Sequence, residues 1–123
     1  MPKKGPFAFP KEKRLLRREQ FSRVSRQGAT LVGRYLVIEW LERSQPGASL
    51  GITASKRYGK SHDRNLFKRR VREAFRLLSP SLPLACDLIV KPRAHAKQAT
   101  FVELQSEMKR QLISLTSRQE QKG

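Results

Sequence analysis

Hydrophobic and polar residues alternate in two neighbouring stretches of the first half of the chain. Over 31–41 the apolar residues Leu36, Ile38 and Trp40 fall on one side of an extended segment, which is typical of a strand with one buried face. A second stretch over 48–55 alternates in the same way. A Ser-Gln-Pro-Gly turn signal lies between the two stretches, so the pattern predicts an antiparallel hairpin.

Helical spacing of apolar residues appears in three other segments. A short helix is predicted over 17–27, because Gly28 provides a C-terminal stop. A longer helix is predicted over 63–78, with Asp63 as its N-terminal cap. A C-terminal helix follows a Thr-x-x-Glu capping box at Thr100. The residues of the second helix expected to face the core are Phe67, Val71, Ala74, Phe75 and Leu78.

One more strand, over 86–91, lies between the two longer helices. The order helix, two or three strands, helix, strand, helix predicts an α+β or α-β sandwich with helices on one face of a small sheet. The Pro- and Lys-containing segment 1–13 is predicted to be a flexible basic arm. A single domain is expected over 14–117, and a frayed polar tail over 118–123.

Charge changes this picture more than any other aspect of composition. The 123 residues include 27 Lys and Arg against 10 Asp and Glu, a formal net charge of +17. A net charge of magnitude about 2–8 suffices for solubility, so this surplus favours a polyanionic partner, with nucleic acid as the leading candidate. We expect a cytoplasmic protein, since the sequence has no secretory signal and no apolar run of membrane-spanning length. Its single cysteine, Cys86, is expected to be a buried free thiol.

The basic residues are densest between positions 56 and 76. Arg64, Lys68, Arg72 and Arg76 recur at every fourth position and would line one stripe of the predicted helix. Like charges at this spacing destabilise an isolated helix by about 0.2–0.5 kcal/mol per pair. A phosphate-bearing partner explains such a stripe better than the alternative, a face that is merely solvated.

The same stretch, SKRYGKSHDRNLFKRRVREAF, closely resembles the signature of the bacterial ribonuclease P protein component. The resemblance extends from about Arg14 to the C-terminal helix. Two departures stand out: Leu66 replaces the last arginine of an Arg-Asn-Arg motif, and Ser25 and Glu39 occupy positions where the family tends to have aromatic residues. The matching positions are Ser55, Lys56, Arg57, Gly59, Arg64, Asn65, Lys68, Arg69 and Arg72.

The resemblance implies a fold ordered αβββαβα, with a four-stranded sheet and a left-handed βαβ crossover. It also implies that a catalytic RNA subunit, which requires Mg²⁺, cleaves the 5′ leader from precursor tRNA while the protein binds both RNAs. The implied contacts to the RNA subunit are Lys56, Arg57, Lys60, Arg64, Asn65, Lys68, Arg69 and Arg72. The implied contacts to the single-stranded leader, in a cleft between the first helix and the sheet, are Phe21, Val37 and Thr53.

Two other function classes compete with this interpretation. Composition alone equally suits a structural RNA-binding protein of the ribosomal type, with no role in cleavage. An autonomous nuclease is disfavoured, because phosphodiester hydrolysis needs clustered carboxylates or a histidine pair. Asp63 and Asp87 are the only aspartates, and His62 and His95 have no recognisable motif around them. We therefore predict no catalytic residue, no metal ligand and no protein partner for this chain.

Overall fold

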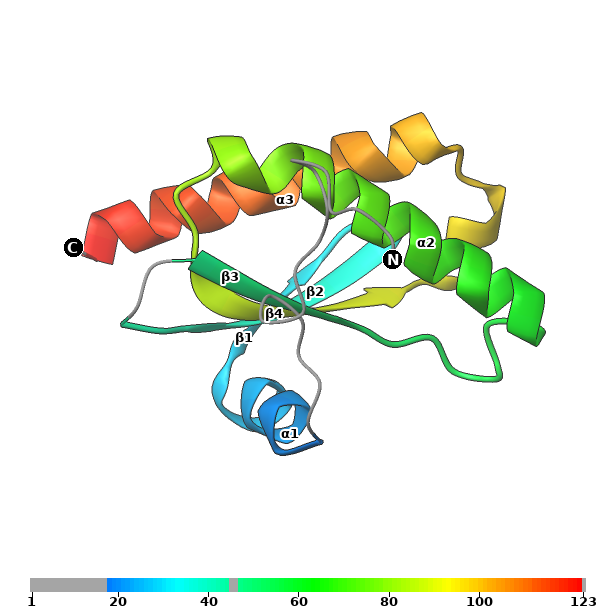
Figure 1. The fold of residues 1–123 in the computed structure, drawn as a ribbon, viewed down its shortest axis with the longest axis horizontal. Coiled ribbons are helices and arrows are strands. Elements are labelled where there is room, and N and C mark those ends of the chain that lie inside the picture. The colour runs from blue at the N-terminus through cyan, green and yellow to red at the C-terminus, as the bar shows by residue number, and fades with distance from the viewer. Residues whose placement is uncertain (1–17, 45–46, 123) are drawn as a thin grey trace, which may run out of the picture.

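Three α-helices and a four-stranded sheet make up the described part of the chain in the computed structural model, which covers residues 18–44 and 47–122 (Figure 1). This confirms the α+β class and the order αβββαβα. The expected arm over 1–13 lies outside the described residues. The elements are α1 (Arg18–Gln27), β1 (Ala29–Val32), β2 (Leu36–Glu42), β3 (Gly47–Ile52), α2 (Ser61–Leu78), β4 (Ala85–Pro92) and α3 (Phe101–Lys122), with 3₁₀ turns at Ser79–Ser81 and Ala94–Gln98.

The strand order is β1-β2-β4-β3, so the predicted hairpin between 31–41 and 48–55 is wrong. The first stretch itself bends into the antiparallel pair β1 and β2, in which Val32 lies opposite Val37. β4 then pairs antiparallel with β2 and parallel with β3, separating the two. Five consecutive residues of β4, starting at Cys86, are buried, and so continuous a buried run, apolar except for Asp87, is typical of a strand with neighbours on both edges and cover on both faces.

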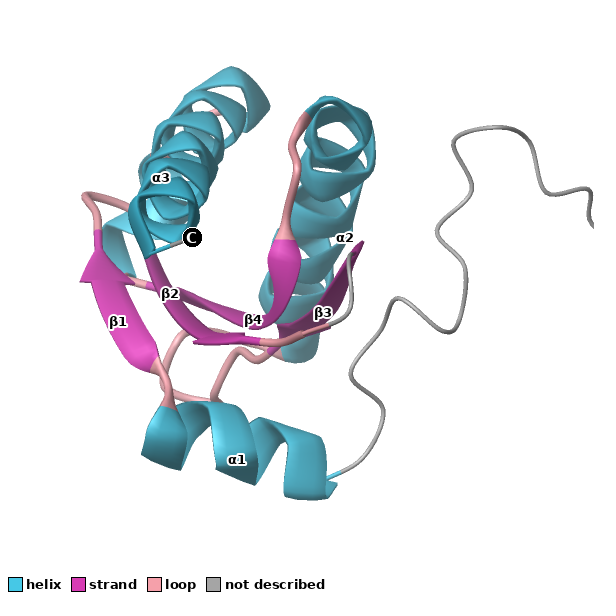
Figure 2. Cartoon of the chain, turned by 90° about the vertical axis from the view of Figure 1, so that its left-hand side faces the viewer, coloured by secondary structure: helices cyan, strands magenta, loops and turns pink. Residues whose placement is uncertain are grey.

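The parallel pair β3 and β4 is joined through α2, which lies on the same side of the sheet as α3 (Figure 2). In Figures 1 and 2 the chain passes from the edge strand β3 over α2 to the inner strand β4 in the left-handed sense. More than nine in ten such crossovers are right-handed. The fold therefore contains the unusual crossover that the family resemblance implied.

The main core lies between the sheet and the pair α2 and α3. The alternation over 31–41 is confirmed there, since Leu36, Ile38 and Trp40 are all buried. Four of the five predicted core residues of α2 are buried as well, whereas Leu78 is half-buried at the edge of the core. On the opposite face α1 is the one described helix, and Val24 and Ile89 form a second, smaller cluster there.

The contact between α1 and the sheet requires glycine at its end. Gly28 follows the last residue of α1 and donates its N–H to the carbonyl of Val24 at 2.9 Å. A Cβ atom at this position would collide with the Trp40 carbonyl oxygen and lie 2.6 Å from that of Val24. Both neighbours are backbone atoms, so a larger residue would have to move α1 away from β2.

A buried carboxylate joins α3 to the turn between β1 and β2. Glu107 accepts hydrogen bonds from the backbone N–H groups of Arg34, Tyr35 and Leu36, at 3.0, 2.9 and 2.7 Å respectively. The residue is only 2% exposed, so these donors replace water around its charge. The backbone of α3 continues to Lys122, beyond residue 117 where we expected the helix to give way to a frayed tail.

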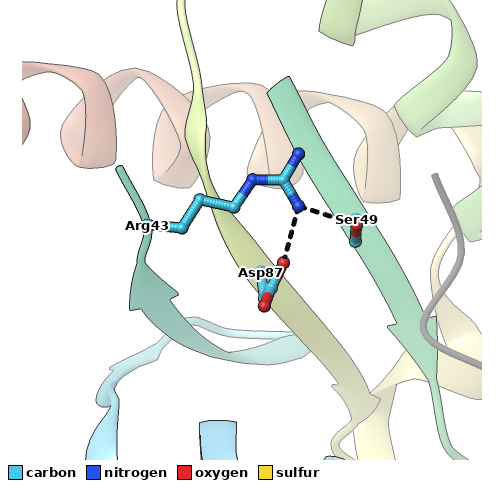
Figure 3. Close-up of polar contacts among 3 residues, drawn as sticks. All are labelled: Arg43, Ser49 and Asp87. Atoms are coloured by element: carbon cyan, nitrogen blue, oxygen red, sulfur yellow. Dashed lines mark hydrogen bonds and ion pairs between the residues drawn. The ribbon is translucent and has the colours of Figure 1, made fainter. Parts of the chain in front are cut away.

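At the far end of the sheet an arginine links three strands. Arg43, which follows β2, places Nη1 3.0 Å from Asp87 Oδ1 on β4 and 3.0 Å from Ser49 Oγ on β3 (Figure 3). Asp87 and Ser49 are both buried, so the arginine satisfies polar groups that would otherwise lack partners. Among the described residues, no helix is long and apolar enough to cross a membrane.

Candidate RNA interface

The helix that carries the basic stripe begins two residues earlier than predicted, at Ser61. Asp63 therefore lies in the first turn instead of at the cap position, and its Oδ2 accepts the backbone N–H of Lys60 at 3.2 Å. A carboxylate in the first turn also interacts favourably with the positive end of the helix dipole. This hydrogen bond fixes the end of the basic loop at residues 56–60 against the first turn of α2.

The predicted cations gather on the outer side of α2 and on the loop before it. Seven of them form no ion pair with a carboxylate within the described residues: Lys56, Arg57, Lys60, Arg64, Lys68, Arg69 and Arg72. Asn65 is exposed among them. Arg64 and Lys68 are half-buried, and the buried Nε of Arg64 has no hydrogen-bond partner in the described part of the chain.

Two other basic residues of α2 are held by the protein itself. Arg70 donates to the carbonyl of Ala99 at 3.1 Å, which ties α2 to the segment before α3. Arg76, the last member of the predicted stripe, forms an ion pair with Glu73. The hydrogen bond from Arg76 lowers the pKa of the Glu73 carboxyl, and that same bond raises the pKa of Arg76. The unpaired part of the stripe therefore ends at Arg72.

A groove of about 310 Å³ lies between α1 and the sheet. Two of the three residues predicted to contact a single strand, Phe21 and Thr53, line this groove. Val37 is half-buried on β2 opposite Lys91, and it is not part of the lining. Phe21 also packs against the Val24 and Ile89 cluster, so it has both a structural and an accessible role. The residues that line the groove are Arg18, Phe21, Ser22, Ser25, Thr53, Ile89 and Lys91.

Two of the three positions that depart from the family pattern contact each other here: Ser25 lines the groove, and Glu39 is its neighbour outside the lining. Ser25 Oγ donates to Glu39 Oε1 at 3.0 Å, from α1 to β2. Lys91 Nζ on β4 lies 3.2 Å from that oxygen. The negative charge of Glu39, which would repel phosphate, is therefore partly balanced by a lysine of the same face.

A second and larger hollow, of about 540 Å³, continues from the groove toward the start of α2. The two share Thr53 and Lys91, and the larger one adds Arg57 and Lys97. Lys97 Nζ lies 5.3 Å from the centre of the Tyr58 ring. Sequence reasoning did not single out Arg18 or Lys97, because neither belongs to a motif; only the fold brings them beside Thr53.

The remaining candidates for chemistry are the two histidines and the single cysteine. His62 and His95 are exposed, and His62 Nε2 lies 3.4 Å from Asp63 Oδ1. Cys86 is buried as predicted, and burial raises the pKa of its thiol to about 12. Within the described ranges, no three His, Cys, Asp or Glu residues come together in a group that could hold a metal ion.

Comparisons with known proteins point to one family. The family model for ribonuclease P matches residues 9–116. The ribonuclease P protein component of Chlamydia felis is 42% identical over 105 residues, which cover 85% of this chain and 74% of that protein. The corresponding protein of Chlamydia trachomatis serovar L2 is 41% identical over 101 residues, covering 81% of this chain and 82% of the relative.

Solved structures agree with these relatives. The Staphylococcus aureus RNase P protein superposes with a TM-score of 0.73 at 29% identity, covering 84% of this chain and 94% of that one. The RNase P protein from Thermotoga maritima gives a TM-score of 0.75 at 28% identity, covering 80% and 94%. Both the sequence and the arrangement of elements are thus shared over most of the chain.

Proposed function

This chain belongs to the ribonuclease P protein family, and from that premise we propose that it binds the RNA subunit of the enzyme and the 5′ leader of precursor tRNA. Proteins of this family are components of an endoribonuclease that processes tRNA. The observation that carries the proposal is the set of unpaired cations on α2 and the loop before it, together with a groove that Phe21 lines and that shares Thr53 and Lys91 with the hollow beside that loop.

The outer side of α2 is proposed to hold the RNA subunit. Its cations lack carboxylate partners among the described residues, so an RNA backbone can neutralise them without first breaking ion pairs. Each neutralised phosphate releases condensed counterions, which supplies affinity independent of base sequence. Arg64, Lys68 and Arg72 would contact phosphates, and the Asn65 amide could donate to phosphate or base.

The groove under α1 is proposed to hold the unpaired leader. Phe21 offers a ring on which a base can stack, and Thr53 faces it from the sheet side of the groove. Stacking on an aromatic side chain contributes about 1–3 kcal/mol per base and tolerates any base. Arg18 and Lys91 supply positive charge for the backbone of that strand. Val37 lies on the same sheet face and would contact only a strand that extends past the groove.

Catalysis is proposed to belong to the RNA subunit, with Mg²⁺ bound there. The residues of this chain would then position the substrate and raise the affinity of the complex for it. A cytoplasmic location, where precursor tRNA is made in bacteria, fits this role.

Reconstitution tests the proposal against the alternative of a structural RNA-binding protein. The pure protein is mixed with a bacterial ribonuclease P RNA and precursor tRNA at low Mg²⁺, and cleavage is followed. We expect the protein to increase cleavage and to bind the RNA subunit. Lys109→Ala, at an exposed position of α3, serves as a control that removes one positive charge away from α2. A protein that neither binds this RNA nor increases cleavage would refute the proposal.

A further inference from the structure

We propose that Glu39 determines base specificity in the groove, by accepting a hydrogen bond from the exocyclic amino group of a leader nucleotide. The groove would then prefer adenine, cytosine or guanine to uracil at the nucleotide that it holds. This inference rests on the proposed binding of the leader and goes beyond it, because an aromatic platform alone reads no base.

The carboxylate of Glu39 is held from two sides. Ser25 Oγ donates to Oε1 at 3.0 Å from α1, and Lys91 Nζ lies 3.2 Å from the same oxygen on β4. The side chain of Glu39 is 17% exposed. Within residues 18–44 and 47–122, no hydrogen bond reaches its other oxygen, Oε2. One oxygen thus orients the group, and the other remains available as an acceptor.

The stacking residue and the carboxylate are close neighbours. Phe21 and Ser25 are four residues apart on α1, so they lie on the same face of the helix and both line the groove. Because Ser25 contacts Glu39 directly, the carboxylate meets α1 about one helical turn, roughly 5.4 Å along the helix axis, from the position of Phe21.

The charges around the groove favour one orientation of the nucleotide. An ionised carboxylate only accepts hydrogen bonds, so it repels phosphate oxygens. Arg18 and Lys91, which line the groove, attract those oxygens instead. The backbone would therefore follow the cations, and the base would turn its edge toward Glu39.

The edges of the four bases then differ in a simple way. Adenine, cytosine and guanine each carry an exocyclic amino group that can donate to Oε2 of Glu39. Uracil has none, and its one ring N–H is flanked by two carbonyl oxygens that a carboxylate repels. Edges of unpaired bases are accessible in single-stranded RNA, which is where proteins commonly read them.

Competition between substrates tests this inference. Precursor tRNAs that differ only in one leader base compete for the reconstituted holoenzyme, and the ratio of kcat/KM values is measured at each leader position. At one position we expect amino-bearing bases to be preferred to uracil by about fivefold to tenfold, the low end for a specific base contact. Glu39→Ala should bring this ratio to about one.

Three further variants refine the measurement. Ser25→Ala keeps the charge of Glu39 but removes its orienting hydrogen bond, so it should reduce the preference in part. Glu42→Gln removes the same charge from the exposed end of β2 and should leave the preference unchanged. Should Glu39→Ala fail to fold, as judged from its Tm, the isosteric Glu39→Gln replaces it and should at least halve the preference, because a neutral amide is a weaker acceptor.

The possible outcomes separate the two proposals. An equal ratio for all bases in the wild-type holoenzyme, or a preference that survives in Glu39→Ala, would overturn the role of Glu39 while leaving leader binding intact. If precursor tRNA gains nothing over mature tRNA in the wild-type complex, both leader binding and the role of Glu39 are refuted.

Discussion

The outer face of α2 and the groove beneath α1 use charge in different ways. On α2 and the loop before it, seven cations have no carboxylate partner among the described residues. In the groove, Lys91 is paired with Glu39, and Glu39 is oriented by Ser25. Unpaired charge suits a surface that binds phosphates regardless of sequence. Balanced charge leaves stacking and hydrogen bonds to decide which strand fits.

The two regions also differ in how they are built. The stripe on α2 comes from one helix, so its geometry depends only on helical periodicity. The groove combines side chains of α1, β4 and the segment after β3. Damage to the packing of α1 should therefore abolish the groove and leave the stripe intact. Loss of charge on α2 should abolish binding by the stripe and leave the groove intact.

The largest effect is expected when Arg64, Lys68 and Arg72 are replaced together by alanine. Each lost phosphate contact lowers the slope of log affinity against log salt by about 0.7–0.9, so the slope should fall by about two to three. Affinity for the RNA subunit, measured by filter binding at several salt concentrations, should drop by about 100-fold or more at low salt. Each single variant should change the slope by about one. An unchanged slope in the triple variant would contradict phosphate contact.

A smaller effect, restricted to the groove, is expected from Gly28→Val. The new side chain would collide with backbone atoms of Trp40 and Val24 and displace α1 from the sheet. The free energy of unfolding should fall by about 1–3 kcal/mol, the usual range for such a clash. Precursor and mature tRNA should then bind the holoenzyme equally well, while the salt dependence of RNA-subunit binding stays normal. Retained preference for precursor tRNA would show that α1 does not form the leader site.

Phe21→Ala should weaken binding of precursor tRNA by about 1–3 kcal/mol, since a stacking surface for one base is lost. Mature tRNA, which has no leader, should be unaffected. Equilibrium binding of both substrates to the reconstituted complex measures the difference. Because Phe21 also packs on Val24 and Ile89, the Tm of the variant is needed as a control. Equal losses for the two substrates would assign Phe21 to the core alone.

The smallest effect is expected from Glu39→Gln, which frees Lys91 from its ion pair. A partly exposed pair of this kind contributes about 0.2–1 kcal/mol, so affinity for a precursor tRNA with uracil at the leader position held by the groove, where no base contact to the carboxylate is lost, should rise by a factor of about 1.4 to 5. The rise should shrink as salt is added, because counterions screen the freed charge. Competition assays with mature tRNA check that the gain depends on the leader. A fall in affinity for this uracil-bearing substrate would mean that the ion pair assists binding instead of opposing it.

Much of the fold could be predicted from local patterns, but strand neighbours could not. Alternation correctly placed Leu36, Ile38 and Trp40 on the buried face of β2. Alternation assigns faces and says nothing about which strand lies alongside, so the hairpin between β2 and β3 was predicted and β4 lies there instead. The parallel pairing of β3 with β4 requires a crossover through α2, and this contact is remote in sequence.

In the candidate site too, local spacing predicted some residues and tertiary contacts decided the others. The cations of α2 were identified from their spacing, and the structure leaves most of them without a carboxylate partner in the described ranges. Phe21 and Thr53 line one groove as predicted, whereas Val37 does not. The pairing of Glu39 with Ser25 and Lys91 joins three elements, and it had no local signal.

The sequence by itself determined the class of fold, the faces of the main helix and strands, and a cationic stripe, because helix and strand periods act over a few residues. The tertiary structure alone decided which strands are neighbours, where the groove lies and which charge of the groove is balanced. Those features arise from contacts between residues far apart in the chain, and the burial of apolar surface in the whole domain selects among them.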